Sequence, residues 1–159
     1  WTLQGRRPSL RAHPGAVKVR HLMRPDPVSL PARAGLDEIL RFADHSPYHH
    51  FPVVDDRGRL TGLIALGDLD RVAYDRRAAR LVTASDLAAH SVEKGSLPAT
   101  ATLAEAKEFF AHFDGHSAAV VRDRRSRTLV GMVERSEVQR AVHAFEKAHP
   151  SSLRKGPES

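Results

Sequence analysis

Residues 29–54 read SLPARAGLDEILRFADHSPYHHFPVV, and residues 96–121 read SLPATATLAEAKEFFAHFDGHSAAVV. The two stretches share 12 identities in 26 positions without a gap, at an offset of 67 residues. The match resumes at an offset of 69, with Gly62 over Gly131, after two additional residues in the loop 122–128. A fixed period of this kind is typical of a repeat architecture. We infer two copies of one unit of about 65 residues.

Each copy has the pattern of a small α/β unit. After the SLP segment, apolar residues recur at helical spacing, which predicts an amphipathic helix. Two short apolar runs separated by a polar turn then predict a β-hairpin. A second helical pattern follows each hairpin, near residues 69–73 and 138–145. The predicted order in each copy is strand, helix, strand, strand, helix.

A three-stranded sheet covered by two helices on one side leaves its other face bare. Burying apolar surface contributes about 25 cal/mol per Å², so two such sheets stabilise each other by packing together. The expected fold is therefore α/β (α+β), with two three-stranded sheets packed face to face in pseudo-twofold symmetry. Ligands bind preferentially in clefts of the kind that form where two such units meet.

Charge is distributed unevenly along the chain of 159 residues. Residues 1–24 hold six Arg and Lys and no acidic residue, whereas residues 25–159 carry 19 charges of each sign. A nucleic-acid-binding protein needs its basic residues on a folded face, so this distribution argues against a nucleic-acid partner. The chain has no cysteine, which excludes disulfides and thiolate sites. It also has no P-loop, nucleophile elbow or GxGxxG motif, so we expect no catalytic activity.

We expect four segments along the chain. Residues 1–16 form a basic leader of the type found beside a membrane. The first repeat occupies residues 17–77 and the second repeat residues 78–146. Residues 147–159 are polar and are expected to form a flexible tail.

Several motifs resemble those of the cystathionine-β-synthase-type (CBS) domain pair, also called a Bateman module. They are VRHLM at residues 19–23, the two SLP segments, FPVVD at residues 51–55, and GLIALGDL at residues 62–69 with its copy at residues 131–138. The resemblance covers about residues 17–145. It implies a regulatory module that requires no cofactor and binds AMP, ADP or ATP between its repeats to control an attached protein.

A narrower resemblance concerns that attached protein. Residues 1–7, WTLQGRR, resemble the segment that follows the last membrane helix of CLC-type chloride channels and transporters. This implies a bacterial ion-transport host, with the module at the cytoplasmic face of the membrane and in a homodimer. The basic leader would then lie near anionic lipid. A membrane protease, a magnesium transporter and a free-standing nucleotide sensor remain alternative hosts.

The resemblance implies a nucleotide site made of residues from both repeats. Asp68 would accept hydrogen bonds from the ribose hydroxyls, although an aspartate there also suits a helix N-cap. Tyr48 would stack on adenine or else cover a helix end. The second-repeat counterpart of Asp68 is Glu137. The complete set is Val28, Tyr48, His49, Phe51, Pro52, Asp68 and Glu137.

Three members of this set, Val28, Phe51 and Pro52, are equally suited to the core. The hydroxyl residue that the family uses for phosphate is replaced by Ala65 and Glu134. A carboxylate at Glu134 would repel phosphate unless Arg135 compensates it. The sequence therefore favours a nucleotide of low charge, or no ligand.

The chain contains ten histidines, which raises the possibility of a metal site. Duplication explains two pairs of them, His45 with His112 and His49 with His116, without metal coordination. The remaining candidate, His50, lies beside His49. Because the spacing is loose, we predict no metal site.

Overall fold

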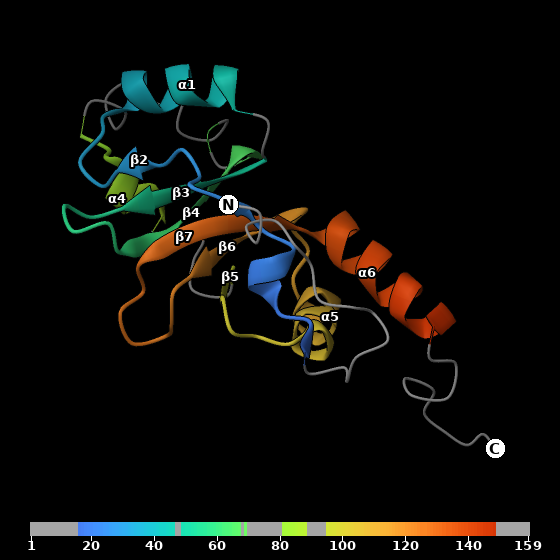
Figure 1. Cartoon of the computed structure of the whole chain (residues 1–159). Helices are drawn as coiled ribbons and strands as arrows, with labels where there is room; N and C mark the ends of the chain where they lie inside the picture. The colour runs from blue at the N-terminus through green and yellow to red at the C-terminus, as the bar shows by residue number, and fades with distance from the viewer. Residues whose placement is uncertain (1–15, 47–48, 68, 70–80, 89–94, 149–159) are drawn as a thin grey trace.

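The computed structural model describes residues 16–46, 49–67, 69, 81–88 and 95–148. Its elements follow the same order in the two halves (Figure 1). The first half contains β2 (Leu30–Pro31), α1 (Leu36–His45), β3 (His50–Val54) and β4 (Leu60–Ala65). The second contains β5 (Ser96–Pro98), α5 (Leu103–His112), β6 (Ser117–Val121), β7 (Leu129–Glu134) and α6 (Arg135–Ala148).

Three further elements are a 3-10 helix at Val19–His21, β1 (Arg24–Pro25) and α4 (Ala84–Ala88). The predicted α/β fold is confirmed. The leader (apart from Ala16), residues 149–159 of the tail, and most of the helix expected near residues 69–73 lie outside the described residues. Lys147 and Ala148, which were expected to begin the flexible tail, belong to α6 instead. Within the described part of the chain, no helix has the length and apolar character needed to cross a membrane.

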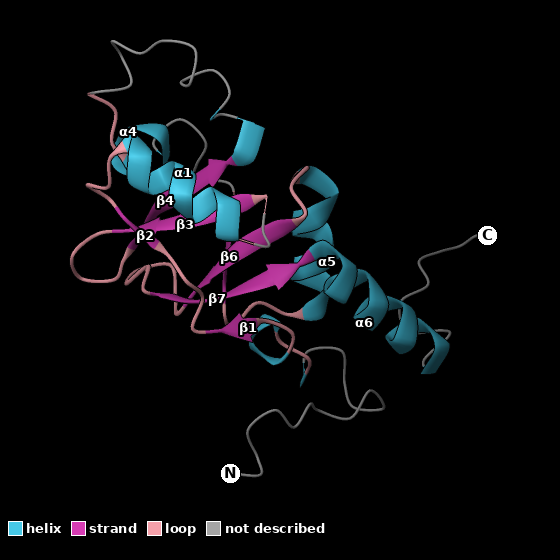
Figure 2. Cartoon of the chain, turned by 90° about the horizontal axis from the view of Figure 1, so that it is seen from above, coloured by secondary structure: helices cyan, strands magenta, loops and turns pink. Residues whose placement is uncertain are grey.

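The two sheets form the middle layers of the molecule. The first has the order β2-β3-β4, with β2 parallel to β3 and β4 antiparallel to it. The second repeats this arrangement as β5-β6-β7 and adds β1, antiparallel to β7. In Figures 1 and 2, α1 lies over the outer side of the first sheet, and α5 and α6 lie beyond the second. The second sheet therefore has one strand more than the three expected.

The helix after each SLP segment begins where the sequence predicts it. Thr102 caps α5: its hydroxyl accepts from the amide of Glu105 at 3.1 Å, and the Glu105 carboxylate accepts from the amide of Thr102 at 2.9 Å. In α1 the N-cap is Gly35, which offers no side-chain acceptor. Both helices turn an apolar stripe to their sheet, with Ile39 buried in α1 and Leu103, Ala106 and Phe110 buried in α5.

The inner faces of the two sheets pack against each other, as predicted. Their contact is a cluster of buried apolar residues: Leu60, Leu63, Ala119, Val121 and Met132. Backbone hydrogen bonds also join the two hairpins. The amide of Leu60 donates to the carbonyl of Arg127 at 2.8 Å, and the amide of Leu129 donates to the carbonyl of Gly58 at 3.1 Å. Leu129 corresponds to Leu60 in the repeat, and Arg127 to Gly58, so the bonds follow the expected pseudo-twofold symmetry.

The segments that precede the two repeats are exchanged between the halves. Val17, Val19 and Leu22 belong to the core of the second half, whereas Ala84, Leu87 and Ala88 belong to the core of the first. Equivalent backbone bonds hold both segments, from Val19 to Ala101 at 2.8 Å and from Ala84 to Ala34 at 2.8 Å. The predicted repeat boundaries at residues 17 and 78 therefore describe the duplication of the sequence. They do not separate the two hydrophobic cores, because each core includes a segment from the other half.

We expect Gly131→Ala to lower the free energy of unfolding by about 1–3 kcal/mol because it overpacks the contact with β1. A β-carbon at Gly131 would lie 2.8 Å from the carbonyl oxygen of Arg24 and 2.5 Å from the Met23 sulfur. Gly67→Ala is the control, since no atom of the described residues, its chain neighbours aside, lies within 4 Å of a β-carbon placed there. Urea unfolding measures both; equal midpoints for the two variants would contradict the close approach of β1.

Candidate functional site

A cavity of about 430 Å³ lies beside the segment that joins β1 to β2. Pockets for small organic ligands usually measure roughly 300–1,000 Å³, so this cavity has the size for one. The β1–β2 segment lines one side and the end of α1 lines the other. The lining residues are Arg24, Pro25, Asp26, Pro27, Val28, Phe42, His45 and Ser46.

Backbone geometry gives this segment its shape. Asp26 adopts a left-handed conformation, with φ of 51°, between Pro25 and Pro27. The prolines restrict the backbone on each side, so the chain turns sharply out of β1. Val28 is thereby left 71% exposed. An exposed valine beside a cavity offers an apolar contact to a flat ligand.

Only a few charged groups surround the cavity. Arg24 and Asp26 come from the β1–β2 segment, and His45 ends α1. Arg24 forms an ion pair with Glu134 of β7, with 3.9 Å between nitrogen and oxygen. The arrangement can hold an apolar ring against Val28 and Phe42 while polar groups contact its edge.

The structure separates the predicted site residues by environment. Val28 lines the cavity, but Phe51 is completely buried and makes an edge-to-face contact with Phe42, 5.5 Å between ring centroids. Pro52 is also buried and lies opposite Leu63 in the first sheet. Phe51 and Pro52 therefore belong to the core, the alternative role the sequence allowed.

Two other predicted residues, Glu137 and His49, are described and do not line this cavity. Glu137 lies in the first turn of α6 and pairs with Arg140 at 2.7 Å. His49 is exposed. Tyr48 and Asp68 fall outside the described residues, so their roles stay predictions.

The sequence left open whether Arg135 compensates the carboxylate of Glu134. In the structure the Arg135 guanidinium donates to the carbonyl oxygens of Phe110, Phe113 and Gly115. Arg24 approaches Glu134 instead. Because Arg24 is far away in sequence, only the pairing of β1 with β7 reveals this contact.

Several residues that line the cavity were not predicted from the sequence. The motif matches leave a gap between VRHLM at residues 19–23 and the SLP segment at residues 29–31, and most of the lining residues that were not predicted lie in this gap. The paired prolines around Asp26 were a usable signal, because they predict a rigid, exposed turn. Phe42 gave no comparable signal, since its helical spacing predicts only a core position.

The histidines are arranged as the duplication requires. The rings of His49 and His116, equivalent in the repeat, lie 5.3 Å apart. His45 and His112 each contact the carbonyl four residues earlier in their own helices, at 2.9 and 3.1 Å. Among the described residues, no group of three or more His, Asp or Glu side chains is placed to hold a metal ion.

Known proteins share this architecture. Residues 19–75 match the family model of the CBS domain. CBSX2, solved in complex with AMP, superposes with a TM-score of 0.64 at 20% identity, covering 81% of this chain and 98% of that structure. The CBS pair of a Mg²⁺ transporter from Shewanella oneidensis MR-1 superposes with a TM-score of 0.65 at 17% identity, covering 80% and 70%. Residues 19–75 therefore match a CBS domain, and the described part of the chain has the fold of CBS-domain pairs.

A curated relative of the module is a much longer protein. The zinc metalloprotease Rip3 of Mycobacterium tuberculosis, from strains Erdman and H37Rv, is 31% identical over 137 residues. This alignment covers 84% of the CBS module but 33% of Rip3. The module thus spans about one third of the length of the curated relatives it matches.

Proposed function

We propose that this CBS module binds an adenine nucleotide of low charge in the cavity beside Val28, and that binding regulates a larger membrane protein. The observation that carries the proposal is the cavity of about 430 Å³, with its exposed valine and the aromatic ring of Phe42. AMP in the related CBSX2 structure supports the same class of ligand. CBS domains are regulatory rather than catalytic, so any reaction belongs to the host.

Charge favours AMP or adenosine over ATP. Two carboxylates, Asp26 and Glu134, lie at or near the cavity, and Arg24 already pairs with Glu134. Each additional phosphate charge increases repulsion from these carboxylates. His45 and Arg24 can balance one phosphate more readily than three.

We propose a zinc metalloprotease as the leading host, because the relationship to Rip3 covers both repeats. The chloride channel or transporter is the second candidate, supported by the WTL segment and the arginines at residues 1–7. A dimer through the CBS domains at the cytoplasmic face, with the leader near anionic lipid, fits both hosts. The two hosts can be distinguished by testing the full-length protein in vesicles. AMP-dependent peptide cleavage would indicate the protease, and AMP-dependent chloride flux would indicate the channel or transporter.

We expect Val28→Asp to weaken AMP binding by about tenfold or more, because a carboxylate replaces the apolar contact and repels phosphate. Its control is Leu81→Asp, which introduces the same charge at a residue that is 82% exposed and does not line the cavity. Calorimetry and thermal shift with adenosine, AMP, ADP and ATP measure the effect. The unliganded melting temperature should stay unchanged in both variants, because both positions are exposed.

Two results would contradict the proposal. One is that none of the four ligands raises the melting temperature at millimolar concentration. The other is that Val28→Asp binds AMP as tightly as Leu81→Asp. The first result would make the module a structural dimerisation domain of its host, and the second would place the AMP site away from Val28.

A further inference from the structure

The two hairpin turns meet at one end of the module and form a single surface. We call residues 55–59 and 122–128 the paired turns. Arg59 and Thr128 form an antiparallel bridge between them, in addition to the backbone bonds that join the hairpins. The paired turns are therefore held in a fixed relative position. Figure 1 places them at the left of the molecule, at the ends of β3–β4 and β6–β7.

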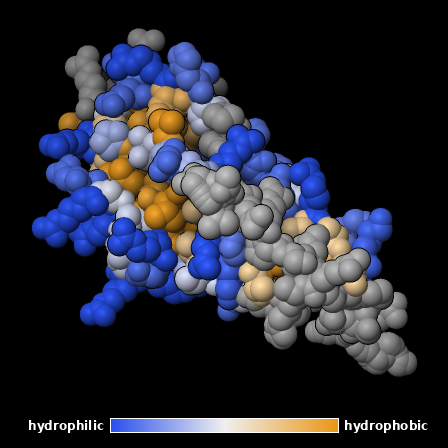
Figure 3. All heavy atoms as spheres, in the orientation of Figure 1, coloured by the Kyte–Doolittle hydropathy of each residue, from blue (hydrophilic) through white to orange (hydrophobic). Residues whose placement is uncertain are grey.

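The paired turns carry six arginines and three aspartates. Figure 3 shows strongly hydrophilic side chains projecting on this side. Because residues 25–159 have no net charge, this excess is a local concentration that the charge of the whole chain conceals. The arginines are Arg57, Arg59, Arg122, Arg124, Arg125 and Arg127.

The aspartates are already engaged locally. Asp55 accepts from the amides of Arg57 and Arg59, each at 2.9 Å, and also from the Arg59 side chain. Asp123 accepts from the amides of Arg125 and Ser126 at 3.0 and 2.7 Å. These backbone N–H groups lower the pKa of both carboxyl groups.

The third aspartate, Asp56, pairs with Arg33 at 3.2 Å. Of the six arginines of the paired turns, Arg59 alone has a carboxylate partner among the residues that the structure describes. The other five arginines have no carboxylate partner within 4 Å among the described residues, although Arg122 lies close enough to help lower the pKa of Asp123.

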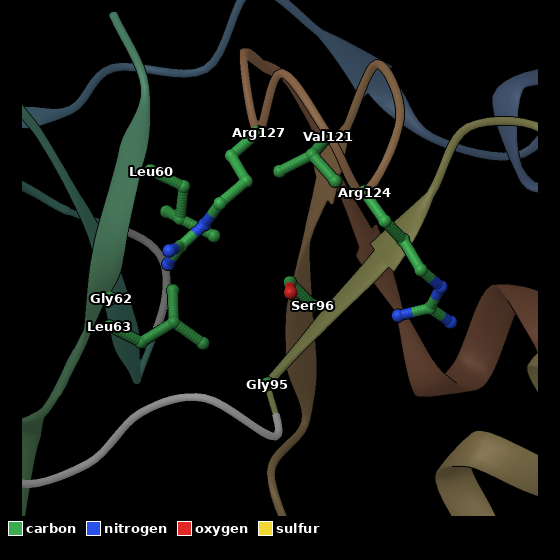
Figure 4. Close-up of a pocket in the computed structure, with 8 residues that line it drawn as sticks. All are labelled: Leu60, Gly62, Leu63, Gly95, Ser96, Val121, Arg124 and Arg127. Carbon is green, nitrogen blue, oxygen red and sulfur yellow. The ribbon is translucent and has the colours of Figure 1, made fainter.

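A second cavity, of about 190 Å³, opens beside these arginines. Figure 4 shows Arg127 reaching toward the β4 wall of the cavity, Ser96 in the hollow, and Arg124 at the side of β5. The cavity is smaller than the roughly 300 Å³ at which pockets for small organic ligands begin, so it suits a phosphoryl-sized group rather than a nucleotide. Its lining is Leu60, Gly62, Leu63, Gly95, Ser96, Val121, Arg124 and Arg127.

Backbone strain at Arg127 independently indicates a function. Arg127 has φ of 57°, the left-handed conformation that glycine adopts without penalty. Its counterpart in the first hairpin is Gly58, with φ of 78°. The second hairpin thus holds an arginine, with its side chain at the cavity, where the backbone favours glycine. Strain of this kind concentrates at ligand-binding sites.

We propose that the paired turns bind a phosphate-bearing anion at the mouth of this cavity, with Arg127 as the principal contact and Arg124 as the second. A guanidinium donates two parallel hydrogen bonds to phosphate oxygens, which favours arginine for this recognition. The same chemistry is offered by an anionic lipid headgroup and by a soluble polyphosphate. The site is separate from the nucleotide cavity, which residues 24–28 and the end of α1 line.

The test uses the full chain at low ionic strength. Inorganic pyrophosphate is titrated by calorimetry, and vesicles of phosphatidylcholine with or without phosphatidic acid are tested by flotation. Arg127→Gly and Arg124→Gln should each weaken binding by about tenfold or more. Arg41→Gln, an equal charge change on the exposed side of α1, should leave it unchanged. Arg127→Gly should also melt no lower than the parent, because glycine suits its backbone conformation.

The two arms identify the source of the phosphate. Pyrophosphate binding without flotation supports a soluble ligand, and flotation with phosphatidic acid alone supports a lipid headgroup. The proposal is overturned if Arg127→Gly and Arg124→Gln behave like Arg41→Gln in both arms. Retention of the same proteins on duplex DNA is measured alongside. The proposal is also overturned if Arg127→Gly and Arg124→Gln weaken DNA retention but change neither pyrophosphate binding nor flotation, since the partner would then be a nucleic acid. Val28→Asp should change neither pyrophosphate binding nor vesicle flotation, so the anion site can be distinguished from the nucleotide site.

Discussion

Phe51→Ala is expected to lower the free energy of unfolding by about 3–5 kcal/mol, the range for removing a buried aromatic side chain. Phe51 has no exposed surface and packs edge-to-face on Phe42 in the core of the first half. Its loss would leave a void beneath the exchanged segment α4, whose apolar residues share that core. Urea unfolding followed by circular dichroism measures the change.

Phe51→Leu is the matched variant, because it keeps most of the apolar volume and should cost about 1 kcal/mol. If Phe51 acts only in the core, Phe51→Leu should bind AMP like the parent. A Phe51→Ala protein as stable as the parent, but without AMP binding, would instead make Phe51 a direct ligand contact. The pair of variants thus separates the two roles that its sequence position allowed.

Arg135→Met is expected to destabilise the module by about 2–4 kcal/mol, because hydrogen bonds from a charged group contribute more than neutral ones. The Arg135 guanidinium donates to three carbonyl oxygens at and after the end of α5. It also lies 5.1 Å from the centre of the Phe110 ring. Removing it leaves the last carbonyls of α5 without these donors and loosens α5 from the start of α6.

Arg140→Met is the control for Arg135→Met. Arg140 is on the same helix, but its side chain is largely exposed and pairs only with Glu137 among the described residues. Exposed pairs contribute about 0–1 kcal/mol, so thermal unfolding should change little. Similar losses in the two variants would show that the carbonyl contacts of Arg135 contribute no more than a surface charge.

Much of the fold could be predicted because its signals are local or repeated. The reciprocal capping of Thr102 and Glu105 depends on residues three positions apart, so the start of α5 can be predicted from one short segment. The duplication predicts that two equivalent sheets bury equivalent faces, and the cluster around Leu63 and Met132 confirms it. The charged turns could be seen in the sequence but not their meeting, which depends on packing between the halves.

The candidate site was harder to predict, because its residues differ in burial rather than in chemical type. Val28 and Phe51 are both apolar and both belong to the predicted nucleotide site, yet one is 71% exposed and the other fully buried. Glu134 and its partner Arg24 meet only because β1 crosses to the second sheet. No local pattern distinguishes these outcomes, since each depends on contacts between distant segments.

By itself, the sequence determined the duplication, the order of helices and strands, and the packing of two sheets, because periodicity and capping act within a few residues. The tertiary structure alone decided which segment completes which core, which predicted residues reach a cavity, and where the arginines of the paired turns gather. The reason is that solvent exposure and ion pairing depend on the three-dimensional neighbours of a side chain. In this module those neighbours come from the other half of the chain.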